Sequence, residues 1–287
     1  MTRIQNILEK AEREGAVRRV RPDVAVDSGP EPMLVTAPPA AHAPAAAPLS
    51  SPAMHAHGSP VAAAAAGPSL NAARLVAGAH LDARLITALS TDSAVAEQYR
   101  ALRTRILYAD PVAPVNVVMI TSPGRGEGKT LTVGNLGLAM AQEWQRRICI
   151  VDADLRRPQL HRLFGLPDGP GLCDVLTGHA TLEEALVTLE EHQVTILPAG
   201  NVPAHPAELL GTTAMRRMME TLRSQFDRVV IDTAPATPLA DVSILSPLVD
   251  RVLLVVRAGV TTKPSIHEAV SSIDPSKLLG FVLNETA

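Results

Sequence analysis

The sequence of 287 residues is poor in aromatic side chains and in cysteine. Phe, Trp and Tyr together make up 2% of it, and Cys149 and Cys173 are the only cysteines. Proteins that bind single-stranded nucleic acid stack bases on aromatic rings, so this scarcity argues against such a platform. The two cysteines form no metal-binding or redox spacing, and we expect two buried, reduced thiols.

The chain also lacks an excess of one charge and a long apolar run. Its 26 basic and 29 acidic residues give a net charge of −3. Nucleic-acid-binding proteins show a basic excess or stripe, so we expect no nucleic-acid partner. No apolar run reaches the 18 residues that a membrane-spanning helix needs, and the N-terminus lacks the apolar core of a signal peptide. These absences predict a cytoplasmic protein, or one that is held peripherally at the inner face of the cell membrane only through a partner.

Composition divides the chain into three zones. Residues 1–20 have apolar side chains at helical spacing, with Ile4, Ile7, Leu8 and Ala11 on one side. This segment is either a docking helix or a marginal solvated helix, since isolated helices of this length are barely stable. Residues 21–80 are rich in Pro, Ala, Ser and Gly and predict a disordered linker. Residues 81–287 carry the Val, Ile and Leu needed for a folded domain.

Within residues 81–287, a helix at 93–108 is followed by alternating strands and helices. We expect the helix at 93–108 to bury one stripe, formed by Val95, Tyr99, Leu102 and Ile106. The predicted strands lie at 115–121, 148–151, 194–197, 228–231, 252–256 and 279–283, and the later helices at 129–143, 182–189, 214–223 and 263–272. Apolar strands alternating with helices predict an α/β fold with a mostly parallel sheet and helices on both faces.

A glycine-rich turn joins the first apolar strand to its helix. Its sequence, Ser-Pro-Gly-Arg-Gly-Glu-Gly-Lys-Thr at 122–130, has the context of a phosphate-binding P-loop, with Pro123 in place of the usual first glycine. Lys129 would bridge the β- and γ-phosphates of ATP, and the Thr130 hydroxyl would bind Mg²⁺. The alternative is a glycine-rich turn with an exposed lysine. The predicted nucleotide-binding residues are Gly124, Arg125, Gly126, Glu127, Gly128, Lys129, Thr130 and Leu131.

Three aspartates end predicted strands. Asp152 and Asp154 close the strand at 148–151, and Asp232 closes the strand at 228–231 in the manner of a Walker B aspartate. Ligands of open α/β sheets bind at the carboxyl ends of the strands. Because Mg²⁺ takes only one or two protein carboxylates, at least one aspartate is left for another task, such as a catalytic base. The alternative is that they are solvated caps at strand ends.

The segment Asp152-Ala153-Asp154-Leu155-Arg156-Arg157-Pro158 resembles the Walker A′ signature of the bacterial tyrosine kinases, or BY-kinases. Residues 97–103 resemble the E-x2-R-x2-R oligomerisation helix of this family, and residues 197–200 and 206–210 resemble further family segments. Residues 4–14 resemble the opening of the exosortase-associated exopolysaccharide kinases. The resemblance implies a MinD/ParA-like P-loop fold and transfer of phosphate from ATP to protein tyrosine in exopolysaccharide or capsule biosynthesis and export.

The resemblance also implies roles for particular residues. Lys129, Asp152 and Asp154 would be catalytic, with Asp152 activating the tyrosine hydroxyl. Thr130, Asp154 and Asp232 would serve Mg²⁺, and Asn284 would lie on the adenine side. A membrane polysaccharide copolymerase, or chain-length determinant protein, would be the partner. Copies of the chain would assemble through Glu97, Arg100 and Arg103, whose alternative is an intrahelical salt bridge on a solvated face.

The sequence departs from the family at its C-terminus, because family kinases usually continue into a tyrosine-rich tail. This sequence ends at Ala287 and contains only Tyr99 and Tyr108, so we expect little self-phosphorylation. Two further functions remain open. One is a regulatory ATP-binding subunit of a polysaccharide export complex that transfers no phosphate to protein. The other is a ParA/MinD-like positioning ATPase, which the absence of a lysine at Gly124 disfavours.

Overall fold

The computed structural model describes residues 73–110, 114–202 and 204–285, which belong to one compact unit. The helix predicted for residues 1–20 and most of the linker predicted for residues 21–80 lie outside the described residues. No helix in the described ranges has the length and apolar character to cross a membrane.

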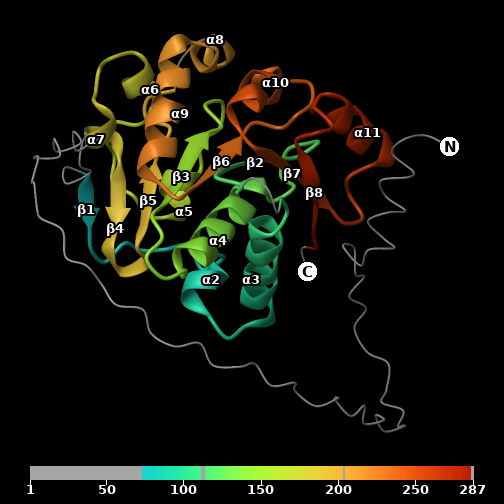
Figure 1. The fold of residues 1–287 in the computed structure, drawn as a ribbon, viewed down its shortest axis with the longest axis horizontal. Coiled ribbons are helices and arrows are strands. Elements are labelled where there is room, and N and C mark those ends of the chain that lie inside the picture. The colour runs from blue at the N-terminus through green and yellow to red at the C-terminus, as the bar shows by residue number, and fades with distance from the viewer. Residues whose placement is uncertain (1–72, 111–113, 203, 286–287) are drawn as a thin grey trace, which may run out of the picture. The chain divides into compact units, whose positions relative to one another are not determined.

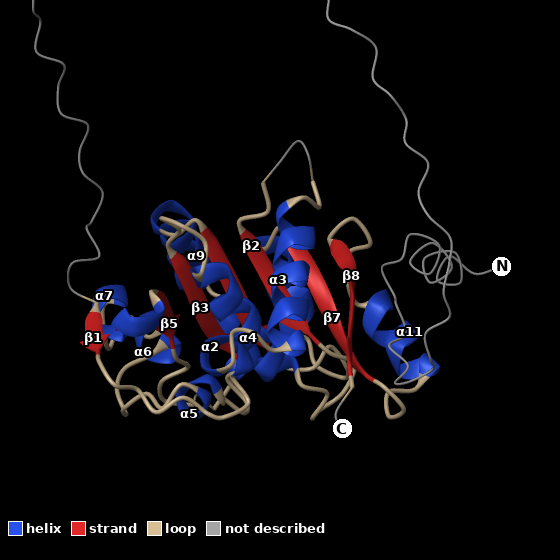
Figure 2. Ribbon diagram, turned by 90° about the horizontal axis from the view of Figure 1, so that it is seen from below, coloured by secondary structure: helices blue, strands red, loops and turns tan. Residues whose placement is uncertain are grey.

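The described residues form an eight-stranded sheet, which Figure 2 shows from β1 at one edge to β8 at the other. All neighbouring strands are parallel except β4 and β5. Every residue of the central strands β2 and β3 is buried, as expected of a parallel sheet with both faces covered. The order is β1-β4-β5-β3-β6-β2-β7-β8, with β1 at Arg74–Val76, β2 at Val117–Thr121, β3 at Ile148–Ala153, β4 at Val187–Leu189, β5 at Val194–Leu197, β6 at Arg228–Thr233, β7 at Arg251–Arg257 and β8 at Leu278–Asn284.

Helices cover both faces of the sheet, which confirms the predicted fold class. Helices α2, α3 and α4 lie on one side, whereas α9 and α10 lie on the other (Figure 1). The helices are α2 at Ile86–Leu89, α3 at Ala94–Leu107, α4 at Lys129–Ala141, α5 at Leu160–Leu163, α6 at Leu172–Leu176, α7 at Leu182–Ala185, α8 at Pro206–Leu210, α9 at Thr213–Gln225, α10 at Asp241–Leu245 and α11 at Lys263–Ser271. Two 3₁₀ turns, η1 and η2, lie at Glu190–His192 and Ser246–Leu248.

Helix α4 lies between the sheet and the helices α2 and α3, and its residues 132–141 are all buried. A side chain on Gly137 would begin 2.4 Å from Ile150 of β3, so this glycine permits the close approach of α4 to the sheet. Helix α3 packs Ile106 into the core, with Tyr99 and Leu102 against it. Val95 was predicted to share this stripe, but it is exposed.

Two predicted boundaries at the β1 edge of the sheet are wrong. The helix predicted for residues 182–189 ends at Ala185, and the β-branched segment after it forms β4, where the Thr188 and Thr195 hydroxyls lie 2.9 Å apart across the pair. The linker predicted to reach residue 80 ends earlier, because residues 74–76 pair with β4 as β1. Neighbouring strands supply the backbone hydrogen bonds that these short segments could not form alone.

Candidate active site

A pocket of about 490 Å³ lies at the carboxyl ends of the central strands. It is lined by the glycine-rich turn after β2, the loop after β3, the loop after β6 and the ends of β7 and β8. Parallel pairing places Asp152 beside Asp232, and Ile120, at the end of β2, beside Asp232 as well. The topology therefore brings the P-loop and the predicted aspartates to one edge of the sheet, where ligands of open α/β sheets bind.

The backbone of the glycine-rich turn has the shape of an anion cradle. Gly126 has φ +71° and Gly128, the N-cap of α4, has φ +93°, a region that favours glycine. No side chain of the described residues caps this end of α4. Residues 128–131 line the pocket, so the N–H groups of this first turn and the positive end of the helix dipole lie beside it.

Asn284 closes the cradle from the β8 side. Its side-chain Nδ2 donates a hydrogen bond to the backbone oxygen of Glu127 at 2.9 Å. A Cβ on Gly128 would begin 2.0 Å from the same nitrogen, so both backbone shape and space require glycine there. Asn284 therefore lies in the pocket wall against the P-loop, and its adenine-side role stays a prediction.

Lys129 faces two of the predicted carboxylates. Its Nζ lies 3.0 Å from Asp154 Oδ2 and 3.9 Å from Asp232 Oδ1. Burial alone would lower the pKa of Lys129, but the Asp232 and Asp154 carboxylates outweigh burial and raise it above its ordinary value. The lysine is therefore a cation held at the floor of the cradle, where phosphate charge would gather.

Asp232 is fully buried, and neither of its carboxylate oxygens has a hydrogen-bond partner among the described residues. Burial raises the pKa of Asp232 to about 6, while the Lys129 ammonium and the Thr130 hydroxyl oppose the rise. Lys129 Nζ, 3.9 Å away, offsets only part of the cost of burying this carboxylate, and a second cation would offset more of it. The environment of Asp232 therefore fits a metal ion.

The donor set matches Mg²⁺ bound together with a nucleotide. Asp154 offers a carboxylate and Thr130 a hydroxyl in the pocket lining, and the buried Asp232 carboxylate lies 3.9 Å from Lys129 of the same lining. Across the described ranges no group of three or more His, Cys, Asp or Glu side chains could hold a metal ion. Mg²⁺ needs no such group, because it commonly takes one or two carboxylates and completes its shell with water and phosphate oxygens.

Asp152 has a different environment from Asp154. It is fully buried and accepts backbone hydrogen bonds from Gln159 at 3.1 Å, from Leu160 at 3.0 Å and from Asp154 at 3.3 Å. Burial raises the pKa of Asp152 well above its ordinary value, and the Asp232 carboxylate adds to the rise. Asp154 lines the pocket, whereas Asp152 organises the loop after β3 from beneath it.

The arginine pair after these aspartates was not given a role from the sequence. Arg156 forms a two-point ion pair with the fully buried Asp241 of α10, with both N–O distances at 3.0 Å. Arg157 lines the pocket and is exposed. The two adjacent arginines are visible in the sequence, but the partner of Arg156 lies 85 residues away and no local pattern marks it.

The predicted oligomerisation residues lie on α3 and make contacts within this chain. Arg100 pairs with Glu97 at 2.7 Å and donates to the Thr91 oxygen at 2.7 Å. Arg103 donates to the Ala139 oxygen, near the C-terminus of α4, at 2.7 Å. The intrahelical salt bridge is therefore present, and the assembly role of Glu97, Arg100 and Arg103 stays a prediction.

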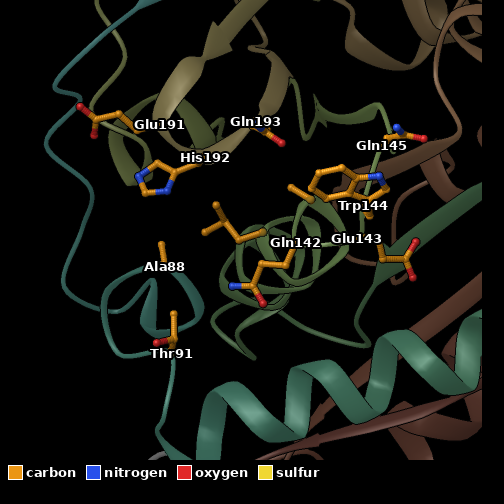
Figure 3. A pocket seen from close by; sticks show the side chains of 11 residues that line it. Ala88, Thr91, Gln142, Glu143, Trp144, Gln145, Glu191, His192 and Gln193 are labelled. Atoms are coloured by element: carbon orange, nitrogen blue, oxygen red, sulfur yellow. The ribbon is translucent and has the colours of Figure 1, made fainter.

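A second pocket of about 600 Å³ lies at the other end of α4 (Figure 3). Trp144 and His192 lie on opposite sides of it, with Gln142 between them. Its lining contains no lysine or arginine and no glycine-rich turn. This pocket therefore lacks the groups that hold phosphate.

The two tyrosines differ in exposure, whereas the two cysteines are both buried. Burial raises the pKa of Tyr99, whose hydroxyl is hydrogen-bonded to Thr132 of α4. Tyr108 is exposed. Cys149 and Cys173 are both free and buried, as predicted.

Comparison with known proteins identifies the family. A family model described as an AAA domain matches residues 115–274. The tyrosine-protein kinase YwqD of Bacillus subtilis is 34% identical over 72% of this chain and 88% of that protein. The tyrosine-protein kinase ptk of Acinetobacter johnsonii is 31% identical over 70% of this chain, which spans 28% of the length of that protein.

Solved structures of similar fold include proteins of the same kind. The chimerical protein CapA2B2 has a TM-score of 0.67 and 31% identity, covering 71% of this chain and 90% of its own. The kinase domain of the Escherichia coli tyrosine kinase ETK has a TM-score of 0.67 and 28% identity, covering 70% and 80%. The predicted exosortase subtype stays a prediction. The 34% identity to YwqD over 88% of that protein, together with the likeness to the solved kinase domain of ETK, shows that the chain belongs to the family of bacterial tyrosine kinases.

Proposed function

We propose that this chain binds Mg·ATP in the pocket at the N-terminus of α4 and transfers the γ-phosphoryl group to a tyrosine hydroxyl of a protein. In this reaction a bond forms between the tyrosine oxygen and the γ-phosphorus. The bond from the γ-phosphorus to the bridging oxygen breaks, ADP leaves, and the tyrosine proton passes to a base. The observation that carries the proposal is the P-loop lysine, held 3.0 Å from a pocket-lining carboxylate at the carboxyl edge of the sheet.

Each residue would act through position and charge, as is general for phosphoryl transfer. The N–H groups of residues 125–131 would hold the phosphates, whereas the Gly124 N–H already donates to Glu127 within the loop. Lys129 would neutralise charge on the β- and γ-phosphates. Thr130 and Asp232 would hold Mg²⁺, and Asp154, which the family resemblance also places at the ion, would instead contact the acceptor. The ion, when bound, supplies charge neutralisation on the phosphate oxygens.

The choice of base differs from the one that the family resemblance implies. That resemblance gives the role to Asp152, whose oxygens already accept backbone N–H groups and whose side chain is fully buried. Asp154 lines the pocket, within reach of an acceptor that enters it. A base must come within hydrogen-bond distance of the proton it accepts, so we assign the acceptor contact to Asp154 and a supporting role to Asp152.

The biological setting follows from the family resemblance. We propose that the chain regulates exopolysaccharide or capsule biosynthesis and export, with a membrane polysaccharide copolymerase as its partner. It would then be cytoplasmic and peripheral at the inner face of the cell membrane through that partner. Assembly through Glu97, Arg100 and Arg103 belongs to the same proposal.

The test is the fate of the γ-phosphate. The chain is incubated with ATP labelled at the γ position, Mg²⁺ and a copolymer of glutamate and tyrosine as acceptor. The proposal expects label on tyrosine of the copolymer, lost in Lys129→Met. Label that appears only as free phosphate would show a regulatory ATPase instead, and no turnover of ATP by the folded protein would contradict both functions.

A further inference from the structure

Glu127 lies between two glycines of the phosphate loop, yet it is only 5% exposed. Its Oε2 accepts a hydrogen bond from the Gly124 N–H at 2.8 Å, and its Oε1 accepts one from the Thr261 hydroxyl at 2.5 Å. A carboxylate in a loop built for phosphate repels the ligand, so its presence there calls for a compensating role.

The contacts of Glu127 join three parts of the chain. The bond to Gly124 closes the phosphate loop on itself. The bond to Thr261 crosses to the turn between β7 and α11, where the Arg257 N–H donates to the same hydroxyl at 2.9 Å. The backbone oxygen of Glu127 accepts the Asn284 amide at 2.9 Å, which ties the loop to the end of β8.

A phosphate loop binds through backbone N–H groups, so its shape must be set before it can hold a ligand well. Glycine loses more conformational freedom on ordering than any other residue, and this loop has three glycines within five positions, 124–128. Fixing such a loop only when the ligand arrives would weaken binding by the cost of ordering it. A brace that is already in place removes that cost.

We infer that Glu127 is a positioning residue, which together with Thr261 holds the phosphate loop in its binding shape before nucleotide arrives and couples it to the turn between β7 and α11. The inference rests on the proposed function, since it takes this loop as the nucleotide site. The negative charge is tolerated because an ionised carboxylate accepts both bonds at once and is turned to Gly124 and Thr261.

Replacing Glu127 with glutamine distinguishes the effect of its two hydrogen bonds from the effect of its charge. Its amide oxygen can accept from the Gly124 N–H, and its amide nitrogen can donate to the Thr261 hydroxyl, so Glu127→Gln keeps both links without the charge. Glu127→Ala removes both links. Thr261→Val removes the hydroxyl with little change of shape, and Thr261→Ser is its matched control because it retains the hydroxyl.

The experiment is calorimetric titration of each purified variant with Mg·ADP, with thermal unfolding measured on the same samples. Glu127→Ala and Thr261→Val are expected to weaken binding by about tenfold or more, because each removes a hydrogen bond to a charged group. Glu127→Gln and Thr261→Ser should stay within about threefold of the parent. The double variant Glu127→Ala with Thr261→Val should bind no more weakly than Glu127→Ala, because the two residues act as one link.

Two results would overturn the inference. If folded Glu127→Ala binds weakly while Thr261→Val binds like the parent, the link to Thr261 does not hold the loop in its binding shape. If both bind like the parent and differ only in melting temperature, their role is structural alone. Thr261→Val carries the test by itself should Glu127→Ala fail to fold. A parent that does not bind Mg·ADP would instead contradict the proposed function.

Discussion

The two ends of α4 face pockets of similar size but opposite character. At its N-terminus lie glycines with positive φ, uncapped N–H groups and Lys129. At its C-terminus lie Trp144 and neighbouring glutamines, and Arg103 already satisfies the Ala139 oxygen. The helix dipole is positive at the first end and negative at the second. The comparison teaches that backbone shape and charge mark a phosphate site, whereas pocket volume does not.

The largest expected effect comes from removing the cation at the N-terminal end. Lys129→Met should lower ATP-dependent turnover by about 100-fold or more, because the lysine stabilises charge on the transferring phosphate. Steady-state kinetics on the folded variant would measure the loss. Lys263→Met, at an exposed position on α11, is the matched control and should turn over like the parent. Equal turnover in Lys129→Met and the parent would refute the site assignment.

A second variant should stabilise the protein while removing its metal dependence. Burial raises the pKa of Asp232 although Lys129 lies 3.9 Å away, so Asp232→Asn relieves an unfavourable charge in the nucleotide-free state. We expect its Tm to rise, by roughly 2–4 °C for each kcal/mol gained. Mg²⁺ should no longer strengthen the binding of ADP.

Asp227, at the opposite end of β6, is the control for Asp232. It accepts the Arg147 N–H at 2.8 Å and pairs with Arg146 at 3.4 Å, so Asp227→Asn should lower Tm and leave the Mg²⁺ effect intact. Scanning calorimetry with and without Mg·ADP compares the two variants. A lower Tm for Asp232→Asn would show that the attraction between its carboxylate and Lys129 outweighs the cost of burying the charge.

Removing the Arg103 side chain, which binds the C-terminal end of α4, should lower the stability of the protein. Arg103→Ala leaves the Ala139 oxygen without its donor and should cost about 1–2 kcal/mol of unfolding free energy. Arg105→Ala, on the exposed side of α3, should cost little. Urea unfolding measures the unfolding free energy of both variants.

Light scattering on the double variant Arg100→Ala with Arg103→Ala tests assembly. We expect this variant to be monomeric at concentrations where the parent assembles. Identical masses for the variant and the parent would favour the intrahelical salt bridge alone.

The surroundings of the two tyrosines predict that the chain phosphorylates itself little. The Tyr99 hydroxyl is hydrogen-bonded to Thr132, and adding nearly two negative charges there would disrupt the packing of α3 on α4. Tyr108 is exposed but follows a folded helix, which cannot align with the γ-phosphate as a flexible segment can. Intact-mass spectrometry after incubation with Mg·ATP should show little or no added phosphate. Two stoichiometric phosphates, absent in Lys129→Met, would contradict this prediction.

The smallest effect is expected at Trp144, the only tryptophan of the sequence. It is 85% exposed and lines the pocket that lacks phosphate-binding groups, so Trp144→Ala should change Mg·ADP affinity by less than about twofold. The fluorescence of Trp144 in the parent should likewise stay unchanged on adding Mg·ADP. A shift in its emission would show that this pocket responds to nucleotide.

Local patterns in the sequence were enough to predict the central strands and the candidate site. Lys129 and the aspartates were found because a P-loop and strand-ending carboxylates are encoded within a few adjacent residues. The periphery was harder, because β1 and β4 are too short to show a period of their own and exist through pairing with neighbours. Contacts between residues far apart in the sequence could not be predicted either, because no local pattern marks them. Arg156 contacts Asp241 across 85 residues, and Glu127 contacts Thr261 across 134 residues.

The central claim is that nucleotide binds at the N-terminal end of α4 and nowhere near its C-terminal end. Hydrogen exchange followed by mass spectrometry, with and without Mg·ADP, tests this most directly because it reports on both pockets in one experiment. The account predicts slower exchange in peptides that cover residues 124–131 and 257–262, and no change in those that cover 142–145 and 191–193. Protection confined to the second pair of segments would contradict it.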